Sequence, residues 1–339
     1  MSIDALSKRG EALTLKDCEC IGLKASEQWN GERIADELEA IFAKSGCPAA
    51  ILKDGGQDLK RGVGMWKESS SARSVPCIDD IGHIVANGLK ADFSELHGFK
   101  IFLKKLKSGA AKLRQSELSF LTPPKIRTKG RFMSITKLAR WAEKIRPLLG
   151  GKGAVPSGSI ASRLRKMLGG FNAHNNFLRN FTVSCAIAET FLQIAKNEGV
   201  NQNTYGAMKD LVQSLPEASN LRTKLDKWLR RHIDIQCKLK MGQTCLIVST
   251  DILESLFGKF KVMIARNPKA EFNRNLLSIP CLCGDFALAT ISKSLNNVTH
   301  DDLLKWTKEN VGHTQNQSRY AFNKSLLTPD MVPKTGNAA

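Results

Sequence analysis

Residues 108–240 contain almost no strand signals, and this absence constrains the fold of the chain more than any other feature. Apolar side chains recur there at the three- and four-residue spacing of amphipathic helices. This spacing predicts helices over residues 135–149, 160–168, 175–197, 204–214 and 220–240. We therefore expect an all-helical segment, inserted into a part of the chain that also contains strands.

Short apolar runs precede this segment and have the length of buried strands. They lie at residues 17–23, 49–53 and 74–78. Helical patterns separate or follow them at residues 31–44, 58–67 and 84–107. A strand, a helix and a second strand in this order most simply form a parallel unit with a right-handed crossover. The expected fold class is α/β with a large all-α insertion.

The strand expected at 49–53 ends on Asp54 and a pair of glycines. In α/β sheets functional groups collect just beyond the carboxyl ends of strands, and glycines leave room for a metal or a phosphate. A second candidate acid, Glu254, lies on a helix for which Ser249 or Thr250 is a suitable N-cap. Magnesium needs few protein carboxylates, but these must converge from different elements. We expect the fold to bring Asp54 and Glu254 together.

Composition and charge indicate the partner. The chain has 339 residues and is 42% hydrophobic, which suits a globular protein with a real core. Residues 101–180 carry 18 Lys and Arg against 2 Asp and Glu, so most of the net charge of +19 lies in this block. A concentrated positive field of this size is typical of a polyanion partner, most commonly nucleic acid. A merely soluble basic surface is the alternative.

The same sequence gives no indication of a membrane or a secretory route. No apolar run is long enough for a membrane helix, and the first residues lack the apolar core of a signal peptide. Nine cysteines are then expected to be reduced thiols, and we expect a cytoplasmic location. Cys18-x-Cys20 and Cys281-x-Cys283 have poor spacing for a structural zinc site, so strand alternation and a loop pair explain them better.

Several stretches, in this order, resemble the DDE-type insertion-sequence transposases and span nearly the whole chain. They are Leu13–Asp17, Ile51–Lys60, Ile78–Lys90, Pro124–Met133, Trp141–Lys144 and Ser249–Lys261. The resemblance implies an RNase H-like catalytic core with a helical insertion before the final glutamate. It also implies that Asp54 and Glu254 are the second and third acids of the catalytic triad. They would bind Mg²⁺ or Mn²⁺ for DNA strand cleavage and transfer at the ends of the element.

The first aspartate of that triad has no counterpart here. In the family it lies on the first strand of the core, upstream of every stretch that matches. Asp4 and Asp17 do not occupy its position. The sequence therefore resembles an N-terminally truncated transposase, with an incomplete core that lacks its first strands. A catalytically inactive remnant that only binds DNA is the alternative, and an unrelated basic RNA-binding protein is a third.

Further residues are candidates for contacts with DNA or with the site. Lys261, seven residues after Glu254, lies on the same helix face and, with Lys259, is expected to hold DNA phosphate. A basic loop is expected to contact the DNA backbone through Lys125, Arg127, Lys129 and Arg131. Asp80 and His83, one helical turn apart, are auxiliary candidates, although a structural hydrogen bond explains them equally well. Asp251 is an alternative to Glu254, and Asp58 is more simply a helix-start acid.

The expected organisation has four parts. Residues 1–107 form the first part of the RNase H-like core, residues 108–245 the basic helical insertion, and residues 246–295 the final part of the core with the Glu254 helix. A C-terminal helix and a disordered tail occupy residues 296–339. The expected partners are transposon-end and target DNA, with a homodimer as a candidate assembly and no membrane.

Overall fold

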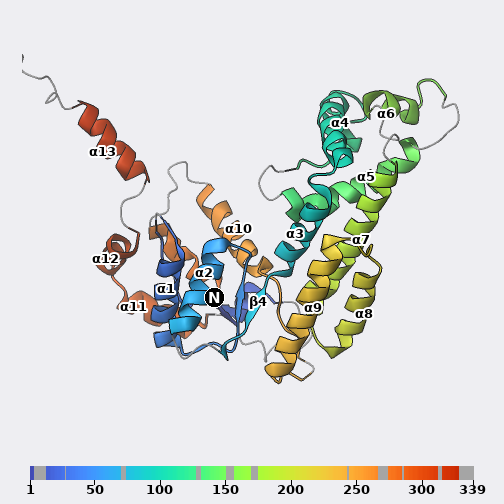
Figure 1. Cartoon of the computed structure of the whole chain (residues 1–339). Coiled ribbons are helices and arrows are strands. Elements are labelled where there is room, and N and C mark those ends of the chain that lie inside the picture. The colour runs from blue at the N-terminus through green and yellow to red at the C-terminus, as the bar shows by residue number, and fades with distance from the viewer. Residues whose placement is uncertain are drawn as a thin grey trace, which may run out of the picture.

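Helices make up most of the protein (Figure 1). The computed structural model describes residues 1–3, 13–26, 28–69, 74–126, 131–149, 156–168, 175–242, 244–265, 274–284, 286–311 and 315–327. Within these residues none of the helices is long and apolar enough to cross a membrane. The described chain divides into a helical middle segment and a smaller part built from residues before and after it.

The expected RNase H-like α/β core is wrong, because the described strands are too few and too short to form one. Strand β1 (Ser2–Ile3) pairs antiparallel with β2 (Cys18–Glu19), and β3 (Ile51–Lys53) pairs parallel with β4 (Cys77–Asp79). Parallel sheets need several strands covered on both faces and nearly continuous apolar runs. In β3 only Lys53 is buried. The protein is nearly all-helical. The short apolar runs form two-stranded pairs and not the larger sheet that an RNase H-like core needs.

The expected pairing of residues 17–23 with residues 49–53 is also wrong, since β2 pairs with β1. The parallel unit consists instead of β3, helix α2 (Gln57–Ser69) and β4. Helix α1 (Gly31–Ser45) packs against α2, and Asn30 caps it by accepting a hydrogen bond from the Arg33 amide. A Cβ at Gly62 would lie 2.5 Å from Ile34, so glycine is what lets the two helices approach.

The middle segment is helical, as expected. Its helices and short 3-10 turns are α3 (Ile81–Phe93), α4 (His97–Arg114), η3 (Ser119–Leu121), η4 (Arg131–Ser134), α5 (Ile135–Leu149), α6 (Ile160–Leu168), α7 (Asn175–Asn197), α8 (Gln202–Gln213) and α9 (Asn220–Lys238). The bounds of α5, α6 and α7 are those that the periodicity predicts. The helix expected over residues 84–107 is two helices, because residues 94–96 interrupt it.

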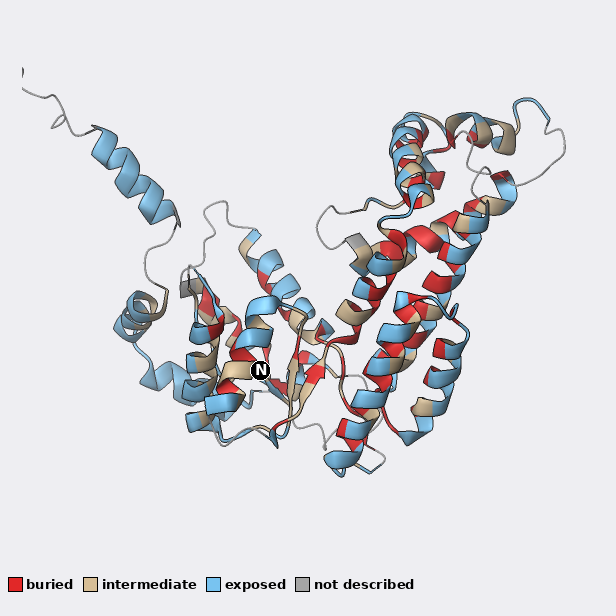
Figure 2. Cartoon of the chain, in the orientation of Figure 1, coloured by how far each residue is buried: buried red, intermediate tan, exposed pale blue. Residues whose placement is uncertain are grey.

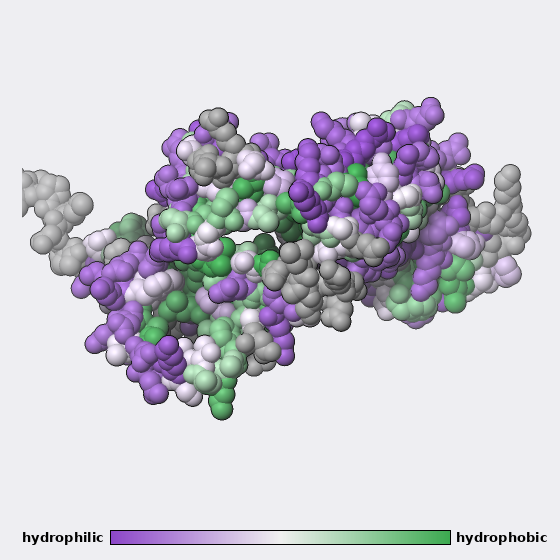
Figure 3. Space-filling view, turned by 90° about the horizontal axis from the view of Figure 1, so that it is seen from below, coloured by the Kyte–Doolittle hydropathy of each residue, from purple (hydrophilic) through white to green (hydrophobic). Residues whose placement is uncertain are grey.

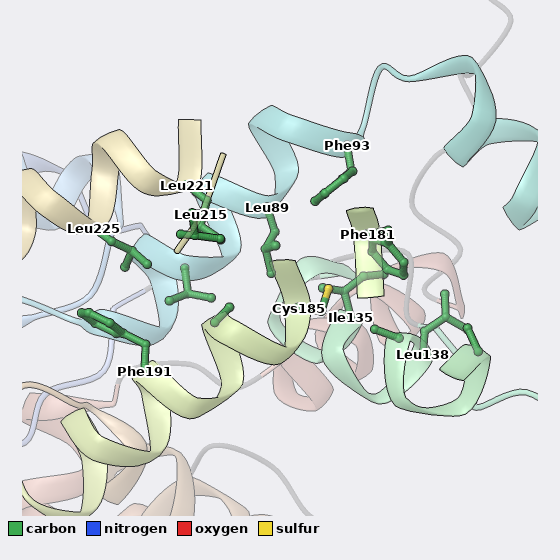
Figure 4. Close-up of a cluster of buried hydrophobic side chains, with 14 of the residues drawn as sticks. Leu89, Phe93, Ile135, Leu138, Phe181, Cys185, Phe191, Leu215, Leu221 and Leu225 are labelled. Atoms are coloured by element: carbon green, nitrogen blue, oxygen red, sulfur yellow. The ribbon is translucent and has the colours of Figure 1, made fainter. Parts of the chain in front are cut away.

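One continuous apolar core holds these helices together (Figure 4). Leu89 of α3, Phe181 of α7 and Leu221 of α9 are all fully buried within it. The approach of α3 to α9 requires Gly88, because a Cβ there would lie 2.6 Å from Leu221. Burial of each large apolar side chain stabilises the fold by roughly 1.5–3 kcal/mol, so this core dominates the stability of the middle segment.

Helix α9 also closes the edge of the small parallel sheet. The indole Nε1 of Trp228 donates to the carbonyl of Asp79 (2.9 Å), and the guanidinium of Arg231 donates to the carbonyl of Cys77 (2.9 Å). The amide of Asp79 in turn donates to Nε2 of His232 (3.1 Å). These backbone groups face away from β3, so side chains of α9 satisfy the positions where another strand would pair.

The C-terminal helices are much less buried than the middle segment (Figure 2). They are α10 (Asp251–Ala265), α11 (Leu288–Asn297), α12 (His300–Asn310) and α13 (Gln315–Leu327), with the 3-10 turns η6 (Arg274–Ser278) and η7 (Pro280–Leu282). A capping box precedes α12, since Thr299 and Asp302 bond each other's amides. Neither α11 nor α12 has a buried residue among those described. On the face in Figure 3, hydrophobic side chains gather around a hollow and hydrophilic ones dominate over the helical middle.

Candidate functional site

The two parallel strands bring Asp54 and Asp80 to the same end of the small sheet. Lys53 is paired with Asp79, so the next residue of each strand lies just beyond the ladder. The amide of Asp80 donates to the carbonyl of Lys53 (3.0 Å) and holds the two strand ends together. Asp54 is half-buried, and its Oδ1 accepts a hydrogen bond from the Gly56 amide (2.8 Å). Asp54 therefore occupies the predicted position at a strand end.

Helix α10, which carries Glu254, begins at this strand end (Figure 1). The amide of Ile81 donates to the carbonyl of Val248 (3.0 Å), and this bond joins the start of α3 to the segment before α10. Glu254 is in the first turn of α10, where its amide donates to the Thr250 carbonyl (3.3 Å). Its side chain is exposed. The structure thus brings together the elements that carry Asp54 and Glu254, although 200 residues separate them in sequence.

Asp80 is the residue that connects these elements. Its carboxylate is 3% exposed, and Oδ2 accepts hydrogen bonds from both the amide (2.6 Å) and the Oγ1 hydroxyl (2.8 Å) of Thr250. Oδ1 accepts from the His83 amide (2.9 Å). Burial alone would raise the pKa of Asp80, but the bonds from Thr250 and His83 hold it below its ordinary value. Asp80 is therefore an ionised anchor whose oxygens are already engaged.

His83 lies between Asp80 and the loop of Asp54. Its Nδ1 is 3.0 Å from Oδ1 of Asp80, a contact that fits an Nδ1–H donor. The side chain lies beside Gly55, where an added Cβ would lie 3.6 Å from the His83 Cβ and 3.7 Å from Cδ2. The side chain is 33% exposed, so part of the ring reaches solvent. Both auxiliary candidates thus belong to one hydrogen-bonded group that reaches Thr250 at the start of α10, and His83 lies beside the Asp54 loop.

The side chains of Asp54 and Glu254 are of the type that binds magnesium. Both offer carboxylate oxygens, which Mg²⁺ prefers, and Mg²⁺ commonly binds to only one or two carboxylates while keeping several waters. Among the residues that the structure describes, no group of three or more His, Cys, Asp and Glu side chains could hold a metal ion. Asp54 and Glu254 are thus two candidate ligands on elements that meet at Asp80.

Other candidate acids have separate structural roles. Asp251, the alternative to Glu254, forms an ion pair with Lys196 (2.5 Å). Asp58 is exposed in the first turn of α2, the position of a helix-start acid. Asp17 forms a capping box with Thr14, and Asp4 lies outside the described residues. These placements leave Asp54 and Glu254 as the acids at the junction of the strand ends and α10.

The structure describes only some of the residues that are predicted to contact DNA. Lys259 and Lys261 are exposed on α10, and Lys125 is exposed after η3. Arg127 and Lys129 lie outside the described residues, as does the side chain of Arg131, whose backbone begins η4. Helices α5 and α7 also enclose a groove of about 340 Å³ lined by Arg140, Arg146 and Arg179 together with Glu143 and Glu189.

The sequence did not predict the ion-pair cluster around the carboxylate of Asp79, the last residue of β4. The Asp79 carboxylate bonds Nζ of Lys53 (2.5 Å) and the guanidinium of Arg231 (2.6 Å). Burial raises the pKa of Asp79, but the bond from Lys53 and the charges of Lys53 and Arg231 bring it below the usual value. A lysine inside an apolar strand run is the one sequence signal that could have indicated a buried acidic partner.

The two Cys-x-Cys segments meet in a small apolar cluster. The amide of Gly284 donates to the carbonyl of Leu15 (2.9 Å), and Cys283 is buried beside Leu15. Burial raises the pKa of the Cys18 thiol to about 11 and also raises that of Cys283. These cysteines are therefore packed, protonated thiols, which agrees with the expectation of reduced cysteines.

No protein-family model, curated protein or solved structure matches the chain. The resemblance to transposases consequently remains a prediction from the sequence stretches quoted above.

Proposed function

We propose that the protein performs metal-dependent DNA strand cleavage and transfer, as an insertion-sequence transposase would. The observation that carries this proposal is the junction at Asp80, which joins the strand end bearing Asp54 to the helix bearing Glu254. Because the strands that the structure describes do not form an RNase H-like core, the proposal depends on this local arrangement and on the sequence resemblance rather than on the fold.

In this proposal Asp54 and Glu254 hold Mg²⁺ or Mn²⁺. A bound ion would polarise the phosphodiester and lower the pKa of an attacking hydroxyl. Asp54 is well suited to a fixed position, because the Gly56 amide restrains one of its carboxylate oxygens. Glu254 extends from the first turn of α10 into solvent, where substrate can reach it.

The basic surface supplies the DNA contacts. Lys259 and Lys261 follow Glu254 on α10 and are exposed, so they can neutralise phosphates beside the site. The strongly basic residues 101–180 lie largely on helices α4 to α7 of the middle segment and would bind the DNA of the transposon end. Such a protein would act in the bacterial cytoplasm, associated with the nucleoid when bound to DNA, with a homodimer as a candidate assembly.

A second candidate function is DNA binding without cleavage. One observation favours it: the described residues contain no group of three potential metal ligands. In that case the basic surface would bind DNA as proposed, while Asp54 and Glu254 would have no catalytic role.

Nicking of supercoiled plasmid with Mn²⁺ separates the two candidates. We expect the wild-type chain to convert plasmid to the nicked form, and we expect Asp54→Asn and Glu254→Gln each to lose this activity while binding DNA as before. Asp58→Asn is the matched control, because it removes an exposed acid from the adjacent helix. DNA binding without any nicking by the wild-type chain would overturn cleavage and support the second candidate.

A further inference from the structure

His83 has one ring nitrogen engaged and the other available. Nδ1 is held by the buried carboxylate of Asp80, which is itself fixed by Thr250. In an imidazole ring Nε2 lies on the side away from Nδ1 and next to Cδ2. Cδ2, the neighbour of Nε2, would lie 3.7 Å from a Cβ at Gly55, so the Cδ2 edge of the ring is the one nearer the Asp54 loop. Among the described residues Nε2 has no hydrogen-bond partner.

The surroundings hold the ring in this orientation. Asp80 is buried, and its other oxygen is committed to the start of α10. A Cβ at Gly55 would meet His83 at ordinary van der Waals distance, so the loop of Asp54 lies close beside this side chain. A carboxylate bonded to one ring nitrogen fixes the imidazole's orientation and leaves the opposite nitrogen for a ligand. Since the side chain is one-third exposed, a ligand can reach that nitrogen.

We propose that His83, carrying a proton on both ring nitrogens in the complex, donates a hydrogen bond from Nε2 to a phosphodiester oxygen of DNA bound at the Asp54–Glu254 junction, with Asp80 as its positioning residue. This inference rests on the proposed function, because it names a contact that the same site makes with its substrate. A phosphate oxygen is the matching partner, since a donor on the imidazole forms a charge-assisted bond with an anionic acceptor. The ring lies beside the loop of Asp54, and its anchor Asp80 is bonded to Thr250 at the start of α10, so DNA held by these elements would pass close to His83.

Two substitutions separate this contact from a purely structural role. The amide of asparagine can replace Nδ1, so His83→Asn should keep the bond to Asp80 and lose the contact at Nε2. The longer amide of glutamine can reach the place of Nε2, so His83→Gln should restore part of the contact. His300→Asn is the control, because His300 is exposed at the start of α12 and distant in sequence from the site.

The experiment combines nitrogen NMR of histidine rings with DNA-binding measurements. On adding a short DNA duplex without metal, we expect the Nε2 resonance of His83 to shift and that of His300 to stay unchanged. We expect His83→Asn to weaken duplex binding by about tenfold, as one charge-assisted hydrogen bond would, with an unchanged melting temperature. His83→Gln should recover part of this loss.

The outcomes are distinct from those of the cleavage test. An unshifted Nε2 resonance on saturation with duplex, or wild-type binding by His83→Asn, would overturn the His83 contact even if the protein nicks DNA. A shift caused by Mn²⁺ alone but not by DNA would also overturn it. Absence of nicking with a shifted His83 resonance would overturn the proposed cleavage and leave the phosphate contact standing.

Discussion

The carboxylate of Asp80 accepts two hydrogen bonds from Thr250, one from its amide and one from its hydroxyl, and both residues are buried. Their sequence separation is 170 residues, so this pair joins the part of the chain before the helical segment to the part after it. Thr250 directly precedes α10, so the contact with Asp80 anchors the start of this helix. The position of Glu254 relative to Asp54 therefore depends on this contact.

Replacing Asp80 with asparagine should destabilise the protein and disturb the site. An amide offers only one acceptor oxygen to the bonds that the carboxylate receives from Thr250 and His83. We expect a loss of about 3 kcal/mol in the free energy of unfolding, measured by urea denaturation, because a buried charged acceptor is removed. Asp58→Asn should change this free energy by less than about 0.5 kcal/mol, as expected for an exposed position.

The same substitution should alter the response to acid. The folded-state pKa of Asp80 is below its ordinary value of 3.8, so the folded protein binds this proton less readily than the unfolded chain. Its stabilising contribution is present above pH 3.8 and is lost as the pH falls toward the folded-state pKa. We expect the difference in melting temperature between wild type and Asp80→Asn to narrow below pH 3.8. A difference independent of pH in this range would contradict this role.

His232 should make stability sensitive to weaker acid. Burial lowers the pKa of His232 from 6.5 to about 4, although its bond to the Trp228 carbonyl opposes this shift. The neutral ring accepts from the Asp79 amide, so protonation breaks a contact that closes β4. Stability should be complete above pH 6.5 and decline between pH 6.5 and 4, by up to about 3 kcal/mol. His232→Gln, which keeps an acceptor but does not titrate, should flatten this decline in urea denaturation series.

Arg231 and Arg230 provide a matched test of the contacts that Arg231 makes between α9 and β4, which we call the clamp. Arg231 bonds the Asp79 carboxylate and the Cys77 carbonyl, whereas Arg230 forms an i,i+4 pair with Asp226. We expect Arg231→Gln to lower the free energy of unfolding by about 1–2 kcal/mol, because two bonds to a half-buried strand are lost. Arg230→Gln should cost less than about 0.5 kcal/mol. Equal effects of the two would show that the clamp contributes nothing beyond surface charge.

Lys261 should contribute to DNA affinity through charge alone. We expect Lys261→Gln to weaken binding of all DNA sequences to a similar extent and to lower the slope of log affinity against log salt by about 1. Lys44→Gln removes the same charge from the exposed last turn of α1 and should leave the slope unchanged. Fluorescence anisotropy at several salt concentrations measures both. A slope that neither substitution changes would place Lys261 outside the DNA interface.

Local patterns were sufficient to predict most helices of the middle segment, although not the break between α3 and α4. The bounds of α5, α6 and α7 follow from apolar periodicity over many residues, and the caps at Asn30 and Thr299 depend on residues only a few positions away. Long amphipathic runs carry enough repeated information to define a helix, and capping side chains act within one turn. The helical character of the middle segment could therefore be predicted from the sequence.

The two-stranded sheets and much of the candidate site could not be predicted from the sequence. Apolar runs such as residues 49–53 are too short to show whether further strands will pair with them, and the RNase H-like expectation failed for this reason. The edge of β4 is closed by Trp228 of α9, which is 149 residues from Asp79 in the sequence. Likewise, nothing local indicates that Thr250 will bond Asp80. Such contacts arise from the packing of distant elements, and a single sequence does not show them.

The central claim is that Asp54 and Glu254 bind the same cation, and Mn²⁺ titration followed by electron paramagnetic resonance tests it most directly. Wild type and Asp58→Asn should deplete the free Mn²⁺ signal equally. Asp54→Asn and Glu254→Gln should each weaken Mn²⁺ binding by about tenfold or more, since each removes one of two carboxylate ligands. If either variant binds Mn²⁺ as tightly as the wild-type chain does, the two acids do not share a metal and the account is contradicted.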